Sequence, residues 1–233
     1  MPNRSPTTLA EQVYLALRAD LLRGRLAPGS KLKLGDFSAR FSVSLSVVRE
    51  AMARLTEQGL VQASPQRGFW VTPLSVDDLR DLTRARVLIE TLALRESVAG
   101  GALAWESTVL ASHHTLEKTP MIEADGSVNP SWESAHRDFH HALLSGCGSA
   151  RLASIATELR DCAELYQFWS RELAHDTDRD VASEHRRIAE LTLSRDARGA
   201  ARALADHIER TTAALVEYVA QRPELAGIQD NSG

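Results

Sequence analysis

Four histidines have the type and spacing to bind a metal ion. His136 and His140 stand four residues apart, so both lie on the same side of the segment if it is helical. His185 and His207 lie in two later segments, each among apolar residues at helical spacing. A single histidine of this kind is usually an ordinary core residue. Four buried imidazoles all need polar partners, and one shared cation would satisfy them at once, which predicts a metal site.

A charged residue interrupts another apolar stripe. Arg86 follows Leu79 and Leu82 and precedes Ile89 at helical spacing, which places a guanidinium on a face that should be buried. One interpretation is an ion pair with Glu90, four residues later. The other is a binding site in which Arg86 forms forked hydrogen bonds with the carboxylate of a small ligand. The spacing alone leaves both open.

The N-terminal third has the element order of a winged helix-turn-helix. A first helix opens with a predicted capping box between Thr8 and Glu11. An apolar residue stands at every fourth position, which predicts one buried stripe of Leu9, Val13, Leu17 and Leu21. A short helix near 35–41, a longer helix near 46–58 and a hairpin around the PQRG turn come next. In this fold the N-terminal end of the longer helix enters the major groove of DNA.

Several residues of this segment suit contacts with DNA. Ser44 and Ser46 stand at the start of the longer helix, where hydroxyl groups and free N–H groups bind phosphate oxygens. Arg49 lies one turn further and can form forked hydrogen bonds with guanine. Arg67 and Gly68 occupy the hairpin tip, where glycine allows close approach and arginine reaches the minor groove. Two further cations are candidates for phosphate contacts, Lys33 and Arg54.

Charge is distributed unevenly along the 233 residues. The first 75 carry ten Lys and Arg against five Asp and Glu, whereas the remainder carries 17 against 26. The net charge of −4 excludes a uniformly basic nucleic-acid-binding protein, but the basic N-terminal part suits a polyanion. The chain has no apolar run long enough for a membrane helix, no secretion-signal pattern and no paired cysteine motif. We therefore expect a cytoplasmic protein.

The pattern changes after Ser75, where strand-like alternation no longer recurs. Six helices are predicted, near 76–98, 103–118, 131–145, 150–175, 183–194 and 197–221. We expect a mostly α fold with a winged helix-turn-helix over residues 1–74. An all-α bundle of six to seven helices should follow over 75–222, with a flexible tail over 223–233.

The run from Leu21 to Ser75 resembles the N-terminal domain of GntR-type bacterial regulators. The matching pieces are LxxGxLxPGxxL, the VREAxxRLxxxGLV block and the RGFxV wing. The resemblance implies that Arg49, the arginine of VREA, and the wing glycine Gly68 contact operator DNA. Many relatives carry arginine after the serine that starts this helix, whereas this chain carries Leu45. The operator sequence therefore does not follow from the resemblance.

The remainder resembles the helical FCD ligand-binding domain of the FadR/VanR branch. The matching pieces are RxxxE, HRDFHHALLSGCGS and SEHRRIAELTLSRDARGAARALADHIERT. The resemblance implies a divalent metal held by an aspartate and three histidines, which His140, His185 and His207 match. His136 takes the place of the aspartate, and Asp138 is expected on a different face.

The change from aspartate to His136 has a chemical consequence. An all-imidazole site adds no negative charge to the cation, and it prefers zinc, nickel or copper over magnesium or manganese. We expect zinc, with nickel as the alternative. The uncompensated charge favours an anionic ligand, and the resemblance favours Arg86 as an effector-binding residue. The expected effector is a small carboxylate, with a dicarboxylate as the first choice.

These features predict a transcriptional repressor that binds double-stranded operator DNA as a homodimer and is controlled by a small organic acid. An alternative is a metal-dependent hydrolase or lyase with an added DNA-binding part. That enzyme would need a general base beside the metal, yet the chain contains no HExxH motif and no carboxylate on the ligand stripes. A third interpretation is a helical interaction module without a ligand.

Overall fold

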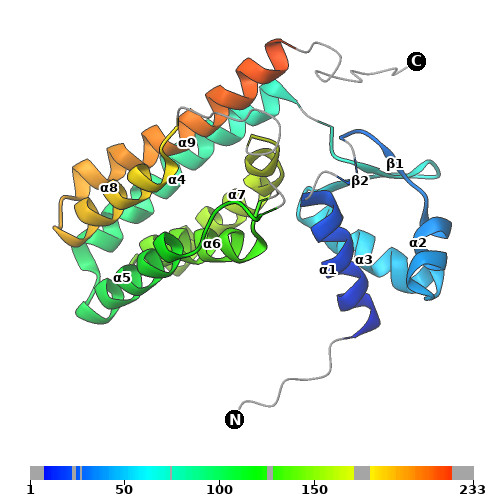
Figure 1. Ribbon diagram of the computed structural model, residues 1–233, viewed down its shortest axis with the longest axis horizontal. Helices are drawn as coiled ribbons and strands as arrows, with labels where there is room; N and C mark the ends of the chain where they lie inside the picture. The colour runs from blue at the N-terminus through cyan, green and yellow to red at the C-terminus, as the bar shows by residue number, and fades with distance from the viewer. Residues whose placement is uncertain are drawn as a thin grey trace.

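The computed structural model describes residues 8–22, 25–26, 28–73, 75–124, 128–170 and 179–221. We call its described residues up to 73 the head and those from 75 the body. Figure 1 shows the head, with short helices and a narrow sheet, beside a body of longer helices. The predicted mostly α fold is confirmed, with a winged helix-turn-helix followed by an all-α part.

The head contains three helices and three strands. They are α1 (Leu9–Leu22), β1 (Lys31–Leu32), α2 (Leu34–Phe41), α3 (Leu45–Glu57), β2 (Val61–Ser64) and β3 (Gly68–Val71). The strands form one antiparallel sheet in the order β1-β3-β2. The predicted hairpin corresponds to β2 and β3, with Val61 opposite Val71 and Ser64 opposite Gly68. Nothing in the local sequence predicts β1, because two residues are too few to show alternation.

A tight turn orients α3 relative to α2. Ser42 adopts the left-handed conformation (φ 54°), and the Ser38 hydroxyl donates to the Val43 carbonyl at 2.6 Å. Val48 and Leu55 on the inner face of α3 are fully buried. The outer face of α3 is therefore left to solvent.

Helix α1 follows the sequence prediction only in part. The Glu11 N–H donates to Thr8 Oγ1 at 3.1 Å, as in a capping box, but the Glu11 carboxylate accepts from Arg54 of α3 and does not reach back. The predicted buried stripe is wrong at its first position, because Leu9 is 58% exposed. The next three members of the stripe are buried, since they pack where α1 contacts α3.

Six helices form the described part of the body. They are α4 (Val76–Gly100), α5 (Leu103–Lys118), α6 (Pro130–Leu144), α7 (Ala150–Trp169), α8 (Val181–Leu193) and α9 (Ala197–Ala220). Helices α4 and α9 run side by side along one edge of the body in Figure 1. The expected continuation of α7 to residue 175 and the expected tail over 223–233 lie outside the described residues. No helix in the described ranges is both long and apolar enough to cross a lipid bilayer.

An apolar cluster spans the head and the body. It contains Leu17 and Leu55 from the head together with Leu165, Tyr166 and Trp169 from α7. Helix α1 contacts α7 directly. Helix α7 therefore faces the head with some of its side chains and the interior of the body with others.

One buried carboxylate joins α4 to α7. Glu90 accepts a hydrogen bond from Arg86 Nε at 2.7 Å on α4 and another from Arg160 Nη1 at 3.1 Å on α7. None of the three side chains is more than 6% exposed. Burial lowers the pKa of the Arg160 guanidinium, although the Glu90 charge opposes this effect. The two guanidinium groups therefore depend on Glu90 for their charge compensation.

Replacing Glu90 should strongly destabilise the fold. In a Glu90→Gln variant two buried guanidinium groups lose their only shared anion, and breaking such a buried pair costs about 3–5 kcal/mol of unfolding free energy. Urea denaturation measures this loss. The matched control is Glu117→Gln, which removes an exposed ion pair with Arg186 and should leave the unfolding free energy unchanged within error. A Glu90→Gln variant as stable as the control would contradict the expectation.

Candidate functional site

The four predicted histidines meet inside the body. His136 and His140 come from α6, His185 from α8 and His207 from α9, and one ligand nitrogen of each lies within 4.8 Å of the others. The Nε2 atoms of His140 and His185 are 3.4 Å apart. All four residues are buried, with exposed fractions between 2% and 8%. The structure thus brings together four residues that span more than seventy positions of sequence.

Local structure of α6 aligns two of the ligands. The helix begins at Pro130, and the Asn129 side chain caps it by accepting from the Ser131 N–H. One helical turn separates His136 from His140. The Trp132 ring stacks on His136, with centroids 4.8 Å apart and planes 17° from parallel. These contacts hold the two imidazoles on the face that α6 turns to the interior.

Burial favours the neutral form of three of the imidazoles. It lowers the pKa values of His140 and His185 well below the ordinary value, and the positive charge of Arg160 adds to the effect at His140. Burial also lowers the pKa of His207, although a hydrogen bond with Glu184 opposes it. A neutral imidazole offers a nitrogen lone pair, which is the form that binds metal ions.

A carboxylate that the sequence did not single out orients His207. Glu184 Oε2 lies 2.7 Å from His207 Nδ1, and Arg179 donates to both oxygens of Glu184, at 2.9 and 2.6 Å. Partial burial raises the pKa of Glu184, but the hydrogen bonds from His207 and Arg179 prevail and lower it to about 2. The anionic carboxylate therefore accepts a hydrogen bond from the Nδ1–H of His207, which leaves the lone pair on Nε2.

A small cavity adjoins the histidine cluster. Its volume is about 40 Å³, which accommodates about three water molecules. Three of the histidines line it, namely His136, His140 and His207, and so do Arg86 and Arg160. The ion pair between Arg86 and Glu90, the first of the two sequence interpretations, is present, and the Arg86 side chain also borders the cavity. Binding of a ligand carboxylate by Arg86 stays a prediction.

Arg160 was not identified from the sequence. Its Nη1 binds Glu90, whereas its buried Nε has no hydrogen-bond partner among the described residues. Two guanidinium groups share one carboxylate here, which leaves an excess of positive charge beside the cavity. The sequence does carry a signal for Arg160, because it follows buried Ala156 by four residues and precedes buried Ala163 by three. That is the same interruption of an apolar stripe that marks Arg86.

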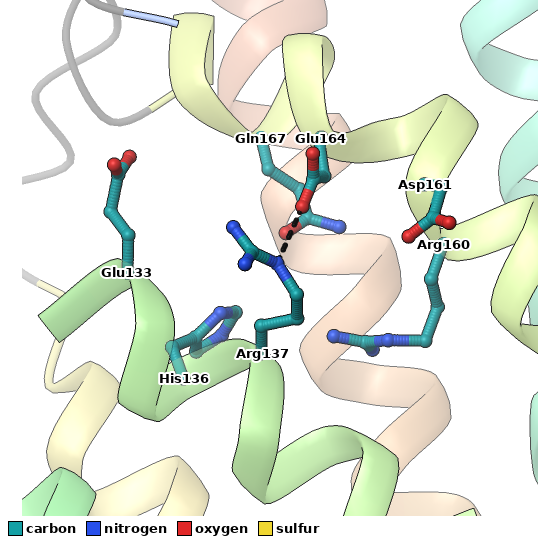
Figure 2. Close-up of a pocket in the computed structure, with 7 residues that line it drawn as sticks. All are labelled: Glu133, His136, Arg137, Arg160, Asp161, Glu164 and Gln167. Carbon is teal, nitrogen blue, oxygen red and sulfur yellow. Dashed lines mark hydrogen bonds and ion pairs between the residues drawn. The ribbon is translucent and has the colours of Figure 1, made fainter. Parts of the chain in front are cut away.

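A second cavity, of about 30 Å³, lies between α6 and α7 (Figure 2). It shares His136, Arg160 and Gln167 with the first cavity. Figure 2 also shows the ion pair between Arg137 Nε and Glu164 Oε1, at 2.8 Å. Asp138 is exposed and lines neither cavity, in keeping with its expected position on another face of α6.

The start of α3 presents the predicted DNA-reading residues to solvent. Ser44 precedes the helix, and its hydroxyl lies 2.7 Å from that of Ser46 without capping the helix. Arg49 is exposed, and Leu45 between the two serines is 48% exposed. An apolar side chain at Leu45 can contact a thymine methyl group but cannot donate a hydrogen bond to a base.

The other residues predicted to contact DNA differ in whether their side chains already bind partners within the protein. Arg67 is exposed at the hairpin turn, and Gly68 has a φ of 110°, which strains any residue with a side chain. Lys33 is exposed just before α2. Arg54 instead donates to Glu11 at 2.6 Å and lies over the Tyr14 ring, 4.0 Å from its centroid. A phosphate contact from Arg54 would have to share the guanidinium with these partners.

Both parts of the chain match known protein families. Residues 9–71 match the bacterial regulatory proteins of the gntR family, and residues 81–210 match the FCD domain.

Two named relatives are similar over most of the chain. One is the uncharacterized HTH-type transcriptional regulator BphR of Paraburkholderia xenovorans, 38% identical over 221 residues, covering 94% of this chain and 89% of the relative. The other is the HTH-type transcriptional repressor GlaR of Escherichia coli, 30% identical over 198 residues, covering 84% of this chain and 90% of the relative.

Two solved structures share the fold. McbR/YncC of E. coli has a TM-score of 0.70 at 19% identity and covers 90% of this chain and 98% of its own. A GntR protein from Rhodococcus sp. also has a TM-score of 0.70, at 23% identity, and covers 89% and 97%. The chain therefore belongs to the GntR family, in the FadR/VanR-like branch with an FCD domain, and it is a DNA-binding transcriptional regulator rather than an enzyme.

Proposed function

We propose that this regulator is a repressor that binds operator DNA as a homodimer and is controlled by a small carboxylate bound beside a zinc ion. Residues 1–74 would bind DNA, and residues 75–222 would bind the metal and the effector. The observation that carries the proposal is the meeting of four buried imidazoles next to a cavity with excess positive charge. The similarity to GlaR, a transcriptional repressor, supports the direction of control.

The donor set of the cluster fits zinc. Zinc–nitrogen bonds of about 2.0–2.1 Å in a tetrahedron place the nitrogens about 3.4 Å apart. The His140–His185 separation of 3.4 Å has this value already, and the spread of 4.8 Å across the cluster requires only small shifts. Imidazole ligands also suit nickel, whereas magnesium and manganese prefer oxygen. When bound, zinc would supply a Lewis-acidic centre that accepts a carboxylate as a fifth ligand.

Charge supports an acidic effector. The metal ligands would all be neutral, so they leave the charge of a dication uncompensated. Glu90 balances only one of Arg86 and Arg160, and the free Nε of Arg160 offers a further donor to an anion. An effector with two carboxylates could place one at the metal and the other at Arg160. This arrangement supports the dicarboxylate expected from the sequence.

The head suits recognition of a two-fold operator. Ser44, Ser46 and Arg49 lie together at the start of α3, and Arg67 and Gly68 lie at the tip of the wing. Lys33 is a further candidate for a phosphate contact, and Arg54 is a candidate only where Glu11 releases it. Two heads related by a two-fold axis would match the two halves of a palindromic site.

Removing one ligand should abolish zinc binding. Metal-free protein titrated with zinc chloride is expected to bind one zinc per chain, and its melting temperature should rise because only the folded state binds the ion. A His140→Ala variant should lose the zinc-induced rise, whereas His114→Ala removes an exposed histidine and should keep it. Calorimetric titration and elemental analysis measure both. Wild-type zinc affinity in His140→Ala would refute the site.

Organic acids should stabilise the zinc-loaded protein. We expect a dicarboxylate such as succinate or malate to raise the melting temperature by several degrees with zinc and by much less without it. Arg160→Lys keeps the charge but loses the forked geometry, so it should weaken acid binding about tenfold or more. A thermal-shift screen measures these effects. Melting temperatures that no acid changes would favour a helical module without an effector.

Arg49 should set base preference. Arg49→Ala is expected to lose about 1–3 kcal/mol of operator binding free energy and to reduce the preference for the operator over a scrambled site by a similar amount. The matched control is Arg84→Ala, which removes the same charge from an exposed position on α4. Fluorescence anisotropy with both DNA sequences at one fixed salt concentration measures the difference. Equal operator affinity of the two variants would show that Arg49 does not read a base.

A further inference from the structure

Three charged residues link the head to the body. Glu164 of α7 forms ion pairs with Arg18 of α1 and with Arg137 of α6. Arg137 Nε lies 2.8 Å from Oε1 of the carboxylate, and the Arg18 guanidinium binds Oε2. One carboxylate thus holds a helix of the head and a helix of the body. We call Arg18, Glu164 and Arg137 the interdomain ion-pair network.

The Arg18–Glu164 pair is better shielded from solvent than an ordinary surface ion pair. The Arg18 and Glu164 side chains are only 18% and 15% exposed, whereas that of Arg137 is 36% exposed. Burial, and next the nearby Arg137 charge, lowers the pKa of Arg18. Ion pairs with little solvent contact are screened less by salt and are geometrically more constrained. The carboxylate is therefore held at a defined position between α1 and α6.

At the body end, the network borders the metal and effector sites. Arg137 directly follows His136 on α6. Arg137 and Glu164 line the cavity of Figure 2 together with His136, Arg160 and Gln167. The last three also line the cavity beside the histidine cluster. Any shift of α6 that accompanies ligand binding at His136 consequently moves Arg137 relative to Glu164.

At the head end, the network binds α1, which packs against the DNA-reading helix α3. Arg54 of α3 donates to Glu11 of α1 at 2.6 Å, and Tyr14 of α1 donates to Gln58 at 2.9 Å, just after α3. Helices α1 and α3 also pack directly against each other. A displacement of α1 is therefore passed to α3 and to Arg49 at its exposed end.

We propose that the interdomain ion-pair network couples occupancy of the histidine site to the placement of the DNA-reading helix. The inference rests on the metal site of the proposed function. Closure of the four imidazoles around a bound ion would shift His136 and with it Arg137, and Glu164 would pass this shift to Arg18. A ligand can change operator affinity only through such a difference between two arrangements of the protein.

Glu164 is a positioning residue, and its charge can be removed while the head and the body stay packed together. The apolar cluster that contains Leu17, Leu165 and Trp169 remains when the charge is lost. Glu164→Gln preserves the size of the side chain and removes its charge. The matched control is again Glu117→Gln, which removes an ion pair between α5 and α8 within the body.

The first experiment measures operator affinity for zinc-loaded and metal-free protein. In the wild type the two dissociation constants should differ by about fivefold or more, as is common for coupled sites. The Glu164→Gln variant should bring this ratio within about twofold of one, while its own zinc affinity stays at the wild-type value. Glu117→Gln should keep the wild-type ratio. A wild-type ratio of one, or an unchanged ratio in Glu164→Gln, would overturn the coupling.

The second experiment needs no metal. Hydrogen–deuterium exchange of α1 amides in full-length protein should speed up in Arg18→Gln and in Glu164→Gln. The double variant should exchange no faster than either single one, because both remove the same interaction. Additive effects would show that the pair does not hold α1. Failure of the wild type to bind zinc would refute the metal site, and the exchange data would then decide the role of the network.

Discussion

The arrangement of the body depends on how the polar groups buried where α4, α6, α7, α8 and α9 meet are paired with one another. Four imidazoles, two guanidinium groups and one carboxylate lie there with little contact with solvent. Glu90 compensates part of the positive charge, and Glu184 orients one imidazole. Each polar group in this region therefore constrains the others, because bulk water hydrates them only slightly.

Stability alone does not explain such an interior. A buried ionic group is often replaced by apolar residues without loss of stability, since desolvation offsets the Coulombic gain. The proposed binding accounts for the arrangement. Buried imidazoles can offer lone pairs to a metal ion, and the excess of guanidinium charge would attract an anion into the adjoining cavity. On this proposal the residues that cost folding energy are those that would distinguish a metal and an acidic ligand from other solutes.

Helix α7 connects this interior to the DNA-binding head. Arg160 and Gln167 border the cavities, while Leu165 and Tyr166 join the apolar cluster shared with the head. One rigid helix thus presents one face to ligand chemistry and another to the part that contacts DNA. This geometry suits a regulator, in which binding at one site must change the arrangement of another.

The sequence by itself determined the fold class, the six body helices and the four histidines, because helical periodicity and the GntR and FCD motifs are local signals. It left β1, the exposure of Leu9 and the pairing of Glu11 with Arg54 undetermined, since each depends on which segments pack together. Only the tertiary structure decided that Arg86 both pairs with Glu90 and borders the cavity, and that Arg160 lies beside it. The meeting of Arg18, Arg137 and Glu164, which spans residues 18–164 of the chain, was likewise decided there, because a charge on a helix face indicates exposure or pairing but never the partner.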